Sequence, residues 1–102
     1  MIHVIATIEI HPGQREAFLA EFHRLMPAVH REAGCLAYAP AIDAETGIDR
    51  QTIKGENILT IIEQWESVEA LKAHLIAPHM QSYRERIKDL VAGATLHILE
   101  PA

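Results

Sequence analysis

The sequence of 102 residues predicts one small α+β domain. Two apolar stripes at three- and four-residue spacing indicate helices. Four short segments, either alternating or rich in β-branched residues, indicate strands. These segments follow one another in the order β-α-β-β-α-β, which is that of two β-α-β halves. We therefore expect a ferredoxin-like fold, in which an antiparallel sheet carries both helices on one face, as a single domain over residues 1–102.

The first half of the chain is expected to contain a strand, a helix and a second strand. Residues 4–10 alternate with period two, as in a half-buried strand. An apolar stripe predicts a helix over residues 12–29, with one proline in its first turn and another, Pro27, as a kink. Gly34 is expected to be the left-handed residue that caps this helix. Residues 35–42 are short and apolar, which predicts the second strand.

The second half is expected to add two strands around a broken helix. Residues 43–57 are polar and contain a turn, followed by an irregular stretch that leaves room for a short strand. Residues 58–65 are rich in β-branched side chains and predict a strand. A helix is expected over residues 68–90, interrupted at Pro78. Residues 95–99 are expected to form the last strand.

The strands are predicted to be apolar on both faces, which a lone sheet covered on one side does not need. One set of side chains is expected to face the helices: Val4, Ala37, Leu59 and Ile61. The opposite set would then lie on the uncovered face: Ile5, Leu36, Tyr38, Ile58 and Ile62. Leaving such side chains in water costs about 2 kcal/mol each. A second copy packed sheet to sheet removes this cost, so we expect a homodimer.

Composition excludes several classes of function. The net charge is −5 and no basic patch is visible, which argues against a nucleic-acid partner and, less strongly, against a phosphorylated substrate. No segment approaches the roughly twenty apolar residues of a membrane span, and the N-terminus lacks the pattern of a signal peptide. The single cysteine, Cys35, is expected to be a buried thiol. We therefore expect a cytoplasmic protein without a membrane partner.

The stretch from residue 63 to residue 80 concentrates the candidate functional side chains. Glu63 and Trp65 are two apart on a strand, so they point to the same face. Ser67 is suited to cap the helix that follows, because its hydroxyl can accept from a free backbone N–H. His74 lies on the apolar side of that helix, and His79 follows the break in the first turn of a new one. We expect these groups to converge on a pocket between sheet and helices.

Several of these segments together resemble the antibiotic biosynthesis monooxygenase family, and within it the bacterial quinol monooxygenases. The segments that carry the resemblance are Pro12-Gly13, Glu32–Tyr38, Ile62–Ser67, Ala73–Met80 and Ile98–Pro101. The resemblance implies a dimeric α+β barrel with a pocket in each subunit. It also implies oxygenation of a small electron-rich aromatic by O₂ without flavin, haem or metal. The absence of a glycine-rich nucleotide fingerprint agrees with this expectation.

We expect His74 and His79 to be the catalytic residues, with His74 as the base that removes a quinol proton. The alternative for His74 is a packed core histidine, and for His79 a capping or surface group. Trp65, Glu63 and Tyr83 are expected to bind substrate, although Trp65 is equally suited to the core and Glu63 to a hydrogen bond within the fold. No cofactor or metal site is expected, because the histidine spacings do not match a metal set.

Two other functions remain open from the sequence. The same fold serves isomerases of small sugar-derived signalling molecules and also non-catalytic, stress-associated dimers that bind a ligand. Haem degradation is less well supported, because the relatives that degrade haem use an asparagine on the first strand where this chain has Ala6. The leading expectation is a cofactor-independent monooxygenase acting on a quinol-type aromatic.

Overall fold

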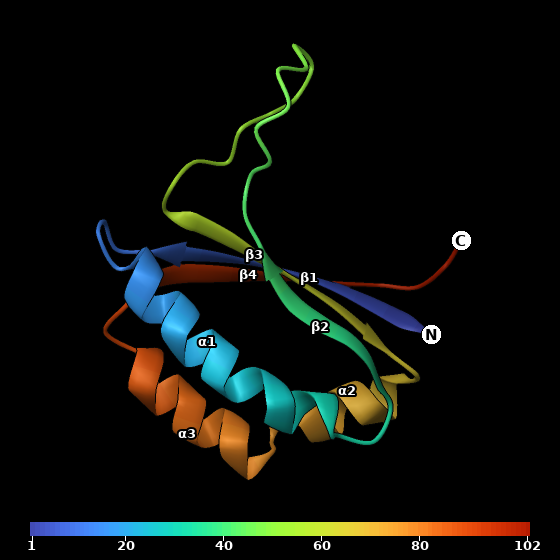
Figure 1. Cartoon of the computed structure of the whole chain (residues 1–102). Coiled ribbons are helices and arrows are strands. Elements are labelled where there is room, and N and C mark those ends of the chain that lie inside the picture. Colours follow the sequence, from blue (N-terminus) through green and yellow to red (C-terminus); the bar gives the residue numbers. More distant parts are fainter.

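The computed structural model describes residues 1–102 and confirms the α+β, ferredoxin-like architecture. One sheet of four antiparallel strands has the order β2-β3-β1-β4, and all helices lie on one of its faces (Figure 1). The elements are β1 (Ile2–Ile10), α1 (Arg15–His30), β2 (Cys35–Ala41), β3 (Ile58–Trp65), α2 (Val68–Leu75), α3 (Pro78–Ile87) and β4 (Val91–Leu99). No helix is long and apolar enough to cross a membrane.

The second helical region is interrupted where the sequence predicts. Ser67 caps α2, its hydroxyl accepting from the backbone N–H of Ala70 at 3.1 Å. Pro78 occupies the first turn of α3, where its missing N–H costs nothing. The break at residues 76–77 therefore lets two short helices cover one sheet face at different angles.

Three element boundaries differ from the prediction. The first helix begins at Arg15, so the Pro12 turn precedes it, and it ends at His30, which places Gly34 beyond its cap. The last strand begins at Val91 rather than Thr95, because its first residues pair with the end of β1 across a bulge at Glu9 and Ile10. Small residues in that segment gave no strand signal, and tertiary pairing decided it.

No strand forms between residues 42 and 57, and the loop there is held by side chains instead. The carboxylate of Asp43 accepts from the backbone N–H groups of Lys54, at 3.0 Å, and Gly55, at 2.8 Å. Gln51 donates to the carbonyl of Ala44 and accepts from the hydroxyl of Thr46. Figure 1 shows this loop rising from the sheet on the side away from the helices.

The inner face of the sheet supplies half of the core. Alternate residues of β3 are buried against the helices from Leu59 to Trp65, and those of β1 from Ile2 to Ala6. The prediction that Tyr38 lies on the outer face is wrong. A register shift between Cys35 and Ala37 reverses the alternation in β2, so Tyr38 faces the helices and Ala37 lies outside.

The turn between α1 and β2 touches α2 at Gly34. This residue has φ +83°, and a Cβ added to it would lie 2.7 Å from the Cβ of Ala70. Its carbonyl accepts from the backbone N–H of Glu66 at 2.8 Å. The left-handed conformation was predicted, but its role is a close approach to α2 and not a helix cap.

We expect Gly34→Ala to destabilise the protein by more than Gly13→Ala. Both glycines are left-handed, so each substitution costs roughly 1–2 kcal/mol for the conformation. Only Gly34 adds a clash, because nothing lies within 4 Å of a Cβ at Gly13. Urea denaturation of the two variants measures the difference. Equal losses in the free energy of unfolding would contradict the close approach.

Candidate active site

A cavity of about 250 Å³ lies between the inner face of the sheet and the helices. Most of its lining is apolar or aromatic and comes from β1, β3, β4, α1 and α3. Three charged or titratable side chains also line it: Glu63, His74 and Arg84. A larger hollow of about 490 Å³ lies under the loop of residues 42–57, but its walls are mostly exposed loop residues. The smaller, mostly apolar cavity is therefore the candidate site.

His74 is held by a residue that the sequence analysis did not single out. Its Nδ1 lies 2.8 Å from Oε2 of Glu32, which follows α1 in the chain. The same oxygen lies 2.8 Å from Nε2 of His79, at the start of α3. An ionised carboxylate can only accept, so both imidazole nitrogens carry the hydrogen and donate to it. Glu32 thus joins three elements and fixes the tautomer of His74.

His74 lines the cavity, and its remaining nitrogen is free. The residue is 2% exposed, and Nε2 makes no hydrogen bond within the protein. Every fully enclosed side-chain nitrogen or oxygen has a partner, so this atom reaches open space. Burial lowers the pKa of His74, although the hydrogen bond that His74 donates to Glu32 opposes that shift. At neutral pH the imidazole is therefore uncharged, and Nε2 keeps a free lone pair.

Glu63 is the second titratable group of the cavity. Its Oε1 accepts from the indole N–H of Trp65 at 2.9 Å, and its other oxygen has no partner in the protein. Burial raises the pKa of Glu63 to about 7, although the hydrogen bond from Trp65 lowers it and nearby Glu32 adds to the rise. The carboxyl is therefore divided between its neutral and ionised forms near neutral pH.

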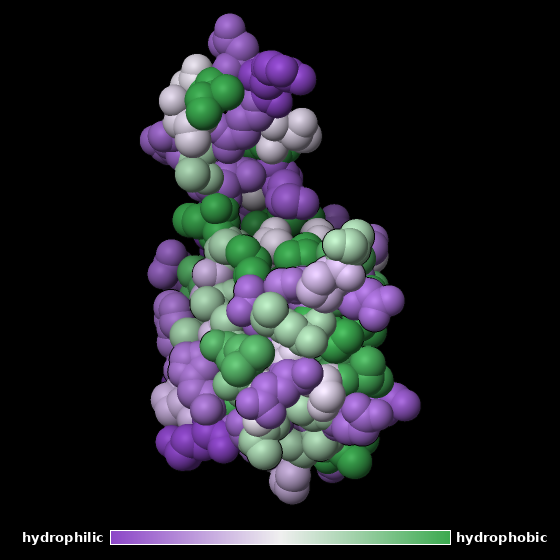
Figure 2. Space-filling view, turned by 90° about the vertical axis from the view of Figure 1, so that its right-hand side faces the viewer, coloured by the Kyte–Doolittle hydropathy of each residue, from purple (hydrophilic) through white to green (hydrophobic).

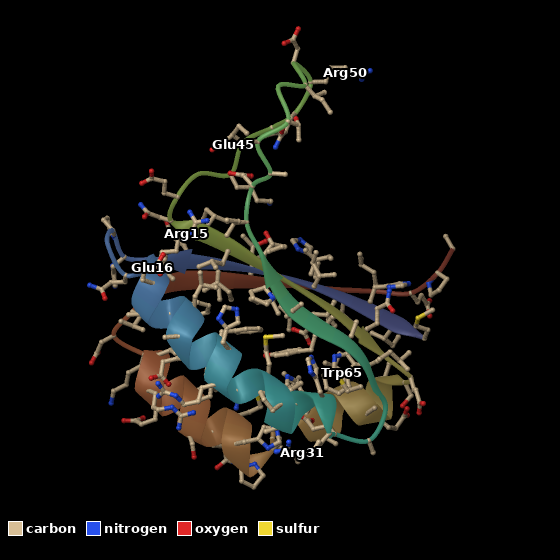
Figure 3. All side chains as sticks on the ribbon, in the orientation of Figure 1. Arg15, Glu16, Arg31, Glu45, Arg50 and Trp65 are labelled. Carbon is tan, nitrogen blue, oxygen red and sulfur yellow. The ribbon has the colours of Figure 1, made fainter.

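Trp65 contacts two residues of the site, His74 and Glu63, from within the core. Its side chain is fully buried between the sheet and the helices, as Figure 3 shows, and it does not line the cavity. The indole ring packs against the imidazole of His74, with ring centroids 4.6 Å apart. The core position weighed in the sequence analysis is thus the observed one, and Trp65 positions both Glu63 and His74.

Two tyrosines add hydroxyl groups to the wall. Tyr83, expected to bind substrate, lines the cavity, and so does Tyr38. Tyr38 lies between His74, in an edge-to-face contact at 5.3 Å, and Phe22, in a stacked contact at 5.0 Å. Neither phenol makes a hydrogen bond in the protein, and neither oxygen is fully enclosed. Burial raises the pKa of both tyrosines, which keeps them uncharged.

His79 does not line the cavity. It is partly exposed and shares the Oε2 acceptor of Glu32 with His74, so only one of the two histidines that the sequence analysis grouped together lines the cavity. Arg84 lines the cavity instead, and its guanidinium donates to the carbonyl of Leu75 at 2.6 Å. No group of three or more His, Cys, Asp or Glu side chains is arranged to hold a metal ion.

Sequence reasoning missed Glu32, Tyr38 and Arg84 as parts of the site. Glu32 gave one signal, because it opens one of the segments that carry the family resemblance. Tyr38 was assigned to the wrong face of its strand, since a bulge cannot be read from alternation alone. Arg84 lies in a polar helical stretch where its charge looks like an ordinary solvated face.

The cavity, which is partly polar and lies under a four-stranded sheet, defines a class of protein. Comparison with known families identifies that class. The model of the family described as antibiotic biosynthesis monooxygenase matches residues 1–86. The chain belongs to this family. Family membership supports a function of the monooxygenase type.

Individual relatives agree with this assignment. The chain is 43% identical to the probable quinol monooxygenase YgiN of Escherichia coli (strain K12), over 99% of this chain and 98% of that protein. The crystal structure of PA3566 from Pseudomonas aeruginosa has a TM-score of 0.80 at 27% identity, covering 99% of this chain and 93% of that one. A crystal structure described as antibiotic biosynthesis monooxygenase shares the fold, with a TM-score of 0.82 at 23% identity over 100% and 99% of the two chains.

Trp65 is the only tryptophan and should report the titration of Glu63. As the pH rises through about 7, Glu63 loses its proton and the indole N–H then donates to a charged acceptor. We expect a change in tryptophan fluorescence centred there. It should vanish in Glu63→Gln.

His74 requires a control, because its imidazole also contacts the indole ring. Its pKa is lowered from 6.5, so its own transition lies on the acidic side and should disappear in His74→Asn. A transition near pH 7 that persists unchanged in Glu63→Gln would contradict the assignment.

Proposed function

We propose that this protein is a monooxygenase that oxidises a small electron-rich aromatic, such as a quinol, with O₂ and without a resident cofactor. The observation that carries the proposal is a mostly apolar cavity lined by His74, whose Nε2 has no hydrogen-bond partner in the protein. A histidine oriented by a partly buried carboxylate and neutral at physiological pH is suited to remove a hydroxyl proton. Similarity to YgiN, named a probable quinol monooxygenase, supports the substrate class.

Deprotonation is the step that such an enzyme must supply. A quinolate is a much stronger reductant than a quinol, so it can pass an electron to O₂ directly. The resulting semiquinone and superoxide combine to place a peroxide on a ring carbon. Loss of water then leaves a hydroxylated quinone, so one quinol and one O₂ give one hydroxyquinone and one water. Apolar walls shelter the charged intermediates from solvent.

Glu32 and His79 act on this chemistry through His74. The carboxylate of Glu32 stabilises the imidazolium that forms when His74 takes the proton. His79 donates to the same oxygen from outside the cavity, so we assign it a positioning role. Its expected effect on turnover is correspondingly smaller than that of His74.

His74→Asn should lower the rate of enzyme-dependent oxygen uptake with reduced naphthoquinols about 10²–10⁴-fold, because a positioned general base is lost. Enzyme-free oxidation must be subtracted at every pH, since quinols oxidise spontaneously as the pH rises. His79→Asn is the matched control, because it loses a contact to the same oxygen of Glu32 without altering the cavity. Activity should survive treatment with a chelator.

A rate for His74→Asn within about threefold of wild type would exclude the general-base role. Equal, large losses in both histidine variants would instead assign the effect to the integrity of the Glu32 cluster. Loss of activity on chelation, or flavin or haem copurifying in stoichiometric amount, would contradict cofactor independence.

We also propose that the chain works as a homodimer with sheets packed face to face. The face of the sheet away from the helices carries small and β-branched side chains, among them Ile5, Ala39 and Ile62. Ile62 is 46% exposed in the single chain. The loop of residues 42–57 rises on that same side and exposes Ile48 and Ile53, so a partner sheet would contact both surfaces (Figures 1 and 2).

Light scattering should give a mass of twice 11.4 kDa at micromolar concentration. Ile62→Asp should yield monomers, because two charges would then face each other across the symmetric interface. Ile76→Asp is the control: Ile76 is 72% exposed, but it lies in the link between the helices on the opposite side. A monodisperse monomer of the wild type would contradict the proposal.

A further inference from the structure

Glu63 has no assigned role in the chemistry, yet its position is unusual. It is 6% exposed and is the only carboxylate that lines the cavity. One oxygen is fixed by the indole N–H of Trp65, and no cation pairs with either oxygen. An unpaired carboxyl buried in an apolar cavity is expensive to keep ionised. Its second oxygen has no hydrogen-bond partner in the protein, and the side chain lines the space where substrate would bind.

The last step of the proposed reaction needs two groups at once. In the ring hydroperoxide, a base must remove the C–H proton while the O–O bond breaks and hydroxide leaves. The C–H electron pair becomes the second bond of the new carbonyl, and the departing hydroxide must take up a proton to become water. His74 alone cannot remove one proton and donate another in the same event.

We propose that Glu63 is the catalytic acid of this second step, an inference that rests on the proposed function. His74 first removes the hydroxyl proton and returns it to the peroxide anion, which regenerates the neutral imidazole. His74 then takes the C–H proton while Glu63 gives its proton to the leaving hydroxide. Water and the hydroxylated quinone are released, and the proton on His74 passes through solvent to the ionised Glu63. The balance of one quinol and one O₂ is preserved.

Other groups of the cavity are less suited to this role. A general acid works best when its pKa lies near the working pH. Burial raises the pKa of the phenols of Tyr38 and Tyr83, which makes them weaker acids. Arg84 does not release a proton in proteins. Burial instead brings the pKa of Glu63 to about 7, so a proton is available there at neutral pH.

The test compares products and not only rates. Wild type and Glu63→Gln are supplied with a reduced naphthoquinol, and oxygen consumed, hydroxylated quinone and hydrogen peroxide are measured together. Without the acid, the ring hydroperoxide should lose hydrogen peroxide and leave the unhydroxylated quinone. We expect oxygen uptake to continue in Glu63→Gln while the yield of hydroxyquinone per O₂ falls at least tenfold. Glu63→Asp should recover part of that yield.

The pH dependence of the hydroxyquinone yield provides a second readout. In the wild type the hydroxyquinone yield should fall as the pH rises through about 7, where Glu63 loses its proton, whereas the low yield of Glu63→Gln should not change with pH. Glu69→Gln, which neutralises an exposed carboxylate on α2 outside the cavity, should match the wild type. Thermal unfolding of each variant shows that the fold is retained.

The outcomes separate the two proposals. Equal product yields in wild type and Glu63→Gln, with oxygen uptake intact, would overturn the role of Glu63 and leave the monooxygenase proposal standing. If the wild type consumes no oxygen above the enzyme-free rate with any quinol tested, the proposed function falls, and the role of Glu63 falls with it. A shift from hydroxyquinone to hydrogen peroxide confined to Glu63→Gln would support both.

Discussion

One carboxylate oxygen ties the site to the fold. Oε2 of Glu32 accepts from His74 on α2 and from His79 on α3, while Glu32 itself lies in the turn between α1 and β2. That turn can reach α2 only because Gly34 has no Cβ to meet Ala70. The close approach of one backbone to another helix thus determines where the imidazole of His74 lies. The contact between the Gly34 turn and α2 therefore contributes both to the packing of the fold and to the position of His74.

A layer of aromatic rings also fixes the position of His74 at the cavity. His74 lies between the rings of Trp65 and Tyr38, and Tyr38 stacks on Phe22 from α1. Offset and edge-to-face contacts of this kind add roughly 0.5–1.5 kcal/mol each to ordinary burial. His74 is therefore held on three sides, by two rings and one carboxylate, and its free nitrogen has a defined direction. A base that is fixed in this way loses little entropy when substrate binds.

Burial acts in opposite directions on the two titratable groups that face the cavity. It lowers the pKa of His74 and raises the pKa of Glu63, because each group is more easily accommodated without charge. At neutral pH the cavity can thus hold a neutral imidazole and a neutral carboxyl side by side. Such an environment suits an uncharged aromatic with hydroxyl groups. Arg84 is then the one permanently charged group of the lining, and further charge appears as the reaction proceeds.

The sequence by itself determined the fold class, the strand and helix order and the broken second helix, and it drew attention to the candidate side chains between positions 63 and 80. These follow from local periodicity, and from Ser67 and Pro78, which act within a few residues. Glu32 could not be placed in the site this way, because it lies 42 residues from His74 in the chain. The sequence also could not show which face Tyr38 occupies, because a single bulge reverses it, or that Trp65 is buried. Only the tertiary structure decided these, because direction and contact depend on how separate elements pack.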